Sequence, residues 1–220
     1  MLLYNETGVL RKGMQARLPA LPGKTIIIGK IVKSNSHVDY AGLVYNELEM
    51  TVTPKPDDYM FGQFVRVPHN GIETTGVIYN SLLINPEFGN YGPRLSTPPE
   101  TNAIFSPDYI NEQGVLIGIL LLGWHNEGRN HQRIPRAVLS AGSLIEKMSD
   151  EEMNAFHRDS NGQLQMHYVP HVITHAGQLA KQLLLTIIEQ LTSIAPEEDH
   201  ARLRVLERTL VWQQTMDQIR

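Results

Sequence analysis

The chain has 220 residues, a net charge of −4 at pH 7, nine histidines and no cysteine. Without cysteine there is no disulfide, thiolate metal site or cysteine nucleophile, and this composition fits a reducing compartment. The small negative charge provides no overall basic field, which disfavours strong sequence-independent binding of nucleic acid.

Residues 1–24 mix polar residues with prolines and glycines, including Pro19, Pro22 and Gly23. This composition predicts an N-terminal arm whose order depends on what it packs against. Polar residues such as Asn5 and Glu6 interrupt any apolar core of signal-peptide length. We therefore expect a cytoplasmic protein without a membrane segment.

Residues 25–125 are predicted to form a β-barrel. Short apolar, β-branched runs alternate there with glycine and proline breaks, the pattern of successive strands. Gly29, in the middle of the first run, marks a position where a barrel strand can bend. The expected strands cover 25–34, 40–53, 64–67, 73–85 and 115–124, with a tight turn at His69-Asn70-Gly71.

The run Val115–Trp124 contains ten residues and no charge. Such a run suits a strand that is covered on both faces, and it is too short to cross a bilayer as a helix. The proline-rich segment Pro86–Asp108 precedes this run and has no clear periodicity, so we expect it to be a functional or mobile loop. The sequence does not decide whether this loop covers a ligand pocket.

Residues 126–169 are predicted to be a connector with one short helix, from Asp150 to about His157. Ser149 and Glu152 have the spacing of a capping box at its start. Residues 170–220 are predicted to be a helical hairpin, with Pro170 in its first turn and Pro196 at the start of its second helix. The predicted fold is therefore α+β, an antiparallel-rich six-stranded β-barrel followed by a C-terminal helical hairpin.

The second helix of the hairpin carries apolar residues on more than one side, so it has more apolar surface than one neighbouring helix covers. We expect it to pack on the barrel, on another subunit or on a protein partner. The candidate partner-binding residues are Leu203, Leu206, Leu210, Trp212 and Met216.

Several segments together resemble the HAS barrel, a small β-barrel at the N-terminus of HerA-type DNA translocases that is related to the N-terminal barrel of rotary ATP synthase subunits. These segments are IGKIVKS, FGQFVRV, GVIYN, VLIGILLLGW and IPRAVLSAGSLIEKMSDEEM, within Thr25–Phe156. In that family Gly62–Val67 and Gly76–Tyr79 would be barrel strands, and Pro135–Ser143 would trail the barrel.

The translocases continue into an ATPase domain, whereas a helical hairpin is predicted here. The resemblance therefore implies a stand-alone barrel that serves as a contact platform in an assembly. It favours a non-enzymatic assembly or adaptor protein that forms homo-oligomers or binds a protein partner, without a catalytic residue or a cofactor of its own.

A metal-dependent enzyme is one alternative. His171 and His175 are four residues apart, the spacing that places two ligands on one face of a helix, and His167 precedes them. A metal site needs a further ligand from elsewhere in the chain, so the spacing also fits ordinary helix histidines.

A single-stranded nucleic-acid binder is the other alternative. It would use Arg129, His131, Arg133 and Arg136, with Trp124 and Tyr91 as stacking partners. The short cluster also contains Glu127, and it equally fits a solvated connector.

Two other motifs have structural explanations. Gly23-Lys24-Thr25 lacks the leading glycine of a phosphate-binding loop and precedes a strand instead of a helix. The acidic pairs Asp57-Asp58 and Glu151-Glu152 fit a turn and a helix start.

Overall fold

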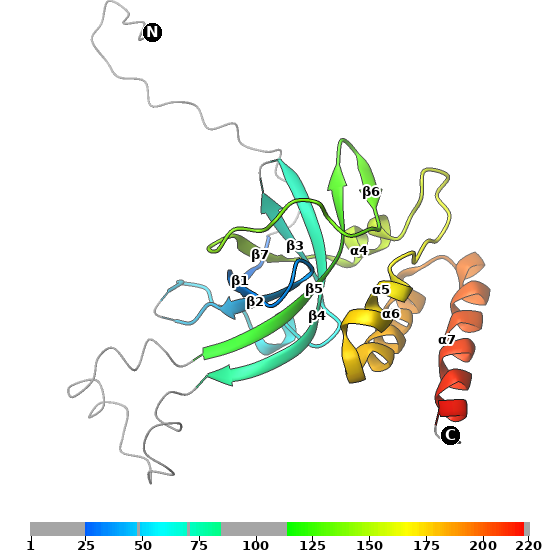
Figure 1. Ribbon diagram of the computed structural model, residues 1–220. Helices are drawn as coiled ribbons and strands as arrows, with labels where there is room; N and C mark the ends of the chain where they lie inside the picture. The colour runs from blue at the N-terminus through cyan, green and yellow to red at the C-terminus, as the bar shows by residue number, and fades with distance from the viewer. Residues whose placement is uncertain (1–24, 48, 70, 85–113, 218–220) are drawn as a thin grey trace, which may run out of the picture.

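The computed structural model describes residues 25–47, 49–69, 71–84 and 114–217 (Figure 1). The predicted N-terminal arm, the loop Pro86–Asp108, Asn70 and Tyr91 lie outside these residues. The strands are β1 (Ile27–Ser34), β2 (Asp39–Val44), β3 (Phe64–His69), β4 (Ile72–Ile84), β5 (Gly114–Asn126), β6 (Arg129–His131) and β7 (Leu144–Lys147). The helices are η1 (Pro56–Asp58), α4 (Asp150–Phe156), α5 (Val169–His175), η2 (Gly177–Leu179), α6 (Ala180–Ile194) and α7 (Glu197–Asp217).

Six strands form a closed antiparallel β-barrel, which confirms the predicted α+β fold. The strands follow one another around the barrel in the order β1, β2, β5, β4, β3 and β7, and β7 pairs again with β1. The pairing of β2 with β5, from Asp39↔Leu120 to Leu43↔Leu116, closes the ring. Strand β6 lies outside the ring, and its one pairing among the described strands is with the end of β5.

Strand β7 completes the barrel well beyond residue 125. It is four residues long and lies between β1 and β3, with Ile145 opposite Gly29 and Glu146 opposite Arg66. The predicted connector therefore contributes a barrel strand. The second predicted strand, 40–53, was too long. Strand β2 ends at Val44, and residues 45–47 and 49–53 form turns and irregular chain.

Strand β5 is covered on both faces, as its uncharged sequence predicted. Ile117, Ile119 and Leu121 point into the barrel, where they belong to one buried cluster. Leu120 and Leu122 point outward into a second cluster, which also contains the buried residues of α6. The alternation of side chains along a strand thus serves two cores at once.

The C-terminal helices cover one side of the barrel (Figure 1). Helix α6 buries Leu183, Leu184 and Ile187 in the core that it shares with the barrel. Helix α7 follows α6 after two residues and packs against it. None of the described helices has an apolar stretch long enough to cross a membrane.

The first helix of the predicted hairpin is interrupted. Helix α5 ends at His175, and η2 separates it from α6. Gly177 has a φ of 57°, in the left-handed region that a continuous helix excludes. The apolar periodicity continues across this break, which is why the pattern predicted one helix.

Helix α4 begins with the capping box that the sequence predicted. The Ser149 side chain accepts a hydrogen bond from the Glu152 backbone N–H, and the Glu152 side chain accepts one from Ser149. Glu152 also forms an ion pair with Arg66 on β3, and Arg66 reaches Glu146 on β7 at 2.7 Å. These contacts fix α4 against the barrel.

Candidate contact surface on helix α7

The inner face of α7 belongs to the core of this chain. Leu203 is fully buried and Leu210 is nearly so, and Leu206 is partly buried against the same cluster. These three candidate partner-binding residues therefore hold α7 to the rest of the chain. Leu203 and Leu210 become available to a partner only if α7 detaches, whereas Leu206 also lines a groove beside the helix.

The outer face of α7 carries large apolar side chains in solvent. Val205 is 64% exposed and Trp212 is 63% exposed. They are seven residues apart, which is nearly two full turns of an α-helix, so they lie on the same face. We define the outer face of α7 as Ala201, Val205, Arg208, Thr209 and Trp212; Met216 lies further along α7, with its side chain outside the described atoms.

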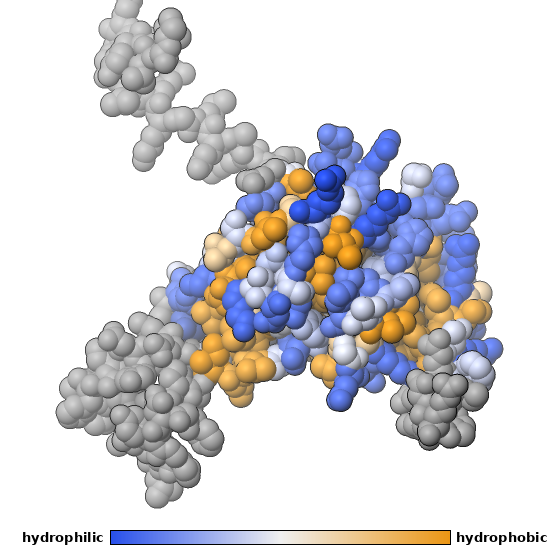
Figure 2. All heavy atoms as spheres, in the orientation of Figure 1, coloured by the Kyte–Doolittle hydropathy of each residue, from blue (hydrophilic) through white to orange (hydrophobic). Residues whose placement is uncertain are grey.

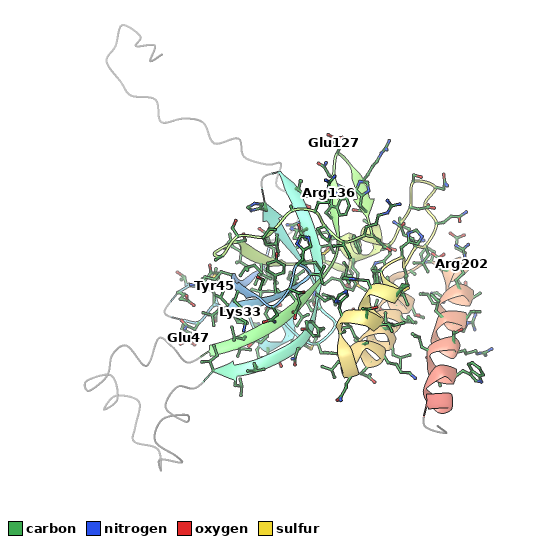
Figure 3. All side chains as sticks on the ribbon, in the orientation of Figure 1. Lys33, Tyr45, Glu47, Glu127, Arg136 and Arg202 are labelled. Atoms are coloured by element: carbon green, nitrogen blue, oxygen red, sulfur yellow. The ribbon has the colours of Figure 1, made fainter. Side chains whose placement is uncertain are left out.

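A groove of about 480 Å³ adjoins this outer face. Its walls come from the first half of α7 and from the segment that precedes α5, and its lining is apolar except for one arginine. Figure 2 shows hydrophobic surface flanked by hydrophilic residues at the end of the molecule where α6 and α7 lie, and Figure 3 labels Arg202 near the start of α7. The residues that line the groove are Leu164, Met166, Ala201, Arg202, Val205 and Leu206.

A salt bridge fixes the start of α7 beside the groove. Arg158 donates to Asp199 at 2.5 Å, and Asp199 is only 5% exposed. The same guanidinium donates to Asn154 on α4 and to the carbonyl of Gly162. One arginine therefore joins α4, the following turn and α7.

Buried Gln132 fixes the other wall of the groove. Its amide nitrogen donates to the carbonyls of Phe156 and Gln165, each at 3.1 Å. Its amide oxygen accepts a hydrogen bond from the backbone N–H of His167 at 2.8 Å. These bonds position the segment that contains Leu164 and Met166, so both walls of the groove are held in place before any partner binds.

A buried histidine lies beneath this segment. His157 is fully buried; its Nδ1–H donates to the carbonyl of Met153, and its Nε2 accepts from the Tyr168 hydroxyl at 2.6 Å. The tautomer follows from the carbonyl of Met153, which can only accept. Burial lowers the pKa of His157 to about 4 and raises the pKa of Tyr168. The pair is part of the core and does not reach solvent.

The candidate metal ligands are only partly brought together. The rings of His171 and His175 are 4.5 Å apart between centroids, but Nε2 of His171 lies 3.0 Å from the carbonyl of Leu121 on β5. Burial and the neighbouring His175 lower the pKa of His171. His167 is exposed, and the described residues contain no group of three side chains that could hold a metal ion.

The arginines of the nucleic-acid hypothesis are exposed, but its aromatic residue is engaged. Arg129 is on β6, and Arg133 and Arg136 follow it. The rings of Trp124 and His131 stack at 4.8 Å across the β5–β6 pair. One face of Trp124 is therefore covered by a side chain of this protein, which leaves less aromatic surface for a base.

Sequence reasoning found the apolar residues of α7 but not the groove beside them. Its far wall, Leu164 and Met166, lies more than thirty positions before α7 in the chain. Gln132, His157 and Arg158, which hold that wall, belonged to the predicted polar connector. No motif marks them, because their role depends on contacts between distant segments.

Comparison with known families identifies a family and no activity. Residues 20–220 match the family described as "Domain of unknown function (DUF8166)", and the chain belongs to this family. No curated protein matches the chain.

Proposed function

We propose that this member of the DUF8166 family is a non-enzymatic assembly or adaptor protein. In this proposal the HAS-like barrel is a rigid platform, and the outer face of α7 binds a protein, either a second copy or another partner. The absence of cysteine from the sequence is consistent with the cytoplasm, where we place it.

The observation that carries the proposal is that α7 has large apolar side chains on two opposite sides, one buried and one exposed. Leu203 and Leu210 hold one side of the helix in the core, while Val205 and Trp212 lie exposed on the opposite side. Tryptophan is enriched among the residues that dominate binding energy in protein interfaces. An apolar groove beside these residues adds the concave surface that such interfaces use.

The filled interior of the barrel favours a role as a rigid platform over a role in binding a ligand inside the barrel. Large side chains from the strands fill it, and Ile28, Val65, Ile117 and Ile145 are fully buried there. Small barrels are commonly filled in this way, as packed cores. A rigid core of this kind keeps the surface of the barrel and of α7 in a fixed geometry.

The metal-dependent alternative would require a local rearrangement. While Nε2 of His171 donates to the Leu121 carbonyl, the ring can offer Nδ1 to an ion, and such a contact is the kind that orients a metal-bound histidine. A third ligand would have to move in, because the described residues contain no group of three side chains that could hold a metal ion. The contact of His171 also attaches α5 to β5.

The proposal is tested by co-purification from cells that naturally make the protein. The full-length protein is compared with a Val205→Asp/Trp212→Asp variant, which places two charges on the outer face of α7. A Val52→Asp/Met60→Asp variant is the matched control, because these side chains are 63% and 54% exposed and lie elsewhere. All three proteins must melt at the same temperature.

We expect the wild type and the control to retain the same protein, a second copy or a different partner, in fixed proportion. The α7 variant should lose it. If the α7 variant retains the same proteins, or if the wild type retains none, the proposed function is wrong.

A further inference from the structure

The outer face of α7 carries both a projecting ring and a groove that could accept one. Trp212 projects from the second half of the helix, and the groove lies beside Ala201, Arg202, Val205 and Leu206 in the first half. At 1.5 Å per residue, Val205 and Trp212 are separated by about 10 Å along the helix axis. Two features that fit each other at a fixed spacing on one surface are the requirement for a self-complementary, two-fold contact.

We propose that the occupant of the groove is a second copy of this chain, paired through antiparallel α7 helices. This inference rests on the proposed function, and it names the partner. Trp212 of each copy inserts into the groove of the other, opposite Val205. The two-fold axis then passes between positions 208 and 209, midway between Val205 and Trp212.

The chemistry of the groove favours an aromatic ring over an aliphatic or acidic partner. Its lining is apolar except for Arg202, an exposed residue at the rim. A guanidinium beside an indole forms a cation–π contact, and tryptophan is the best aromatic partner for it. The indole N–H can remain directed to solvent at the open side of the groove.

The two Trp212 rings supply part of the area that a specific interface needs. A tryptophan buries roughly 150–250 Å² when fully covered, and Trp212 is 63% exposed, so the two rings and the surfaces that cover them contribute roughly 400–600 of the ~1,200 Å² that small specific interfaces bury. Val205, Ala201 and the aliphatic parts of Arg208 and Thr209 extend the contact along the helix. The groove is also preorganised, because Arg158 and Gln132 already hold both of its walls in place in the free protein.

The first test is the molar mass of the full-length protein in solution, measured by light scattering over a dilution series. The wild type should have the mass of a dimer, and Trp212→Ser should be monomeric, with a dissociation constant raised at least about 100-fold because two central tryptophans are lost. Val211→Ser is the matched control, since Val211 is also exposed but about 100° around the helix from Trp212. It should remain a dimer.

The second test fixes the direction of the helices and uses the absence of natural cysteine. A single Arg208→Cys should form an intermolecular disulfide, because position 208 lies beside the two-fold axis. A single Ala201→Cys should not, because the two copies of position 201 would be about 22 Å apart along the axis. In a parallel pairing, both variants would crosslink.

A monomeric wild type at all concentrations overturns this inference, and so does a dimer that survives Trp212→Ser or crosslinks through Ala201→Cys. These outcomes leave the proposed function to its own test. A monomer that still co-purifies another protein through the outer face of α7 would show that the groove serves a different partner.

Discussion

His157 and Tyr168 form a buried hydrogen bond of 2.6 Å between the imidazole Nε2 and the phenol hydroxyl. The hydroxyl must donate, because the Nδ1–H of the same ring is used by Met153. Phe64 and Phe156 pack against the imidazole with ring centroids 5.2 and 5.3 Å away. The bond joins the end of α4 to the residue that precedes α5, beneath the groove.

The protein should become less stable as the pH falls from 6.5 towards 4. In this range His157 is neutral in the folded state but becomes protonated in the unfolded chain. Burial lowers the folded pKa of His157 to about 4, from 6.5. Between these values the unfolded chain binds more protons, so the contribution of His157 is complete above pH 6.5 and is lost towards pH 4. This contribution is about 3 kcal/mol, and urea denaturation at pH 7.5 and 4.5 measures it.

The control is a His157→Gln variant, whose stability should depend less on pH over the same interval. The imidazole resonances of the wild-type protein give an independent measurement that does not need this variant to fold. One of the nine histidines should not titrate between pH 5 and 8. A His157 resonance with its midpoint near 6.5 would contradict the buried neutral ring.

Tyr168→Phe should destabilise the protein by about 1–3 kcal/mol, because it leaves a buried imidazole nitrogen without its donor. Thermal or urea unfolding at pH 7.5 measures the loss. Tyr45→Phe is the comparison, since Tyr45 is partly exposed and its ring, which lies 5.4 Å from the Lys30 ammonium, is retained in phenylalanine. Equal effects of the two changes would mean that the hydroxyl of Tyr168 is not needed.

Gly62→Ala should be more damaging than Gly71→Ala. Both glycines have a positive φ, 85° and 80°, so both substitutions carry a conformational cost of about 1–2 kcal/mol. At Gly62 the new Cβ would also lie 2.7 Å from Cγ2 of Thr186 on α6, whereas nothing lies within 4 Å at Gly71. We expect an additional loss of about 1–3 kcal/mol from this steric contact.

The cause of that additional loss can be checked with a second substitution. Thr186→Ser removes the Cγ2 atom that the new methyl group would meet, so it should recover part of the stability in the Gly62→Ala background. In the Gly71→Ala background it should recover none. A double mutant that is no more stable than Gly62→Ala would show that the contact with α6 is not the cause.

The barrel could be predicted because its strands are locally distinctive. β-Branched residues and an uncharged run mark β1 and β5, and Ser149 with Glu152 marks the start of α4. Strand β7 could not be found in this way, because Leu144–Lys147 is four residues long and is stabilised by pairing with distant β1 and β3. Short strands of this kind owe their structure to their neighbours, and their own composition is uninformative.

Only part of the contact surface on α7 could be predicted, because the other part depends on contacts with distant residues. The sequence pattern placed apolar residues on more than one side of this helix, but it could not say which side faces the core. The structure decides this, since Leu203 and Leu210 are buried. The groove could be found only in the structure, because folding brings Leu164 and Met166 to α7, where the hydrogen bonds of Gln132 and the salt bridge of Arg158 hold the two walls.

Hydroxyl-radical footprinting of Trp212 measures whether another protein molecule covers the outer face of α7 in the cell. The oxidation rate of Trp212 is measured in living cells and in the dilute purified protein, each relative to Met60, which is 54% exposed elsewhere on the surface. We expect the ratio of Trp212 to Met60 oxidation to be several-fold lower in cells, because a bound protein excludes water from the ring. The same ratio in cells and in dilute solution would mean that Trp212 remains in water and that no protein covers the outer face of α7.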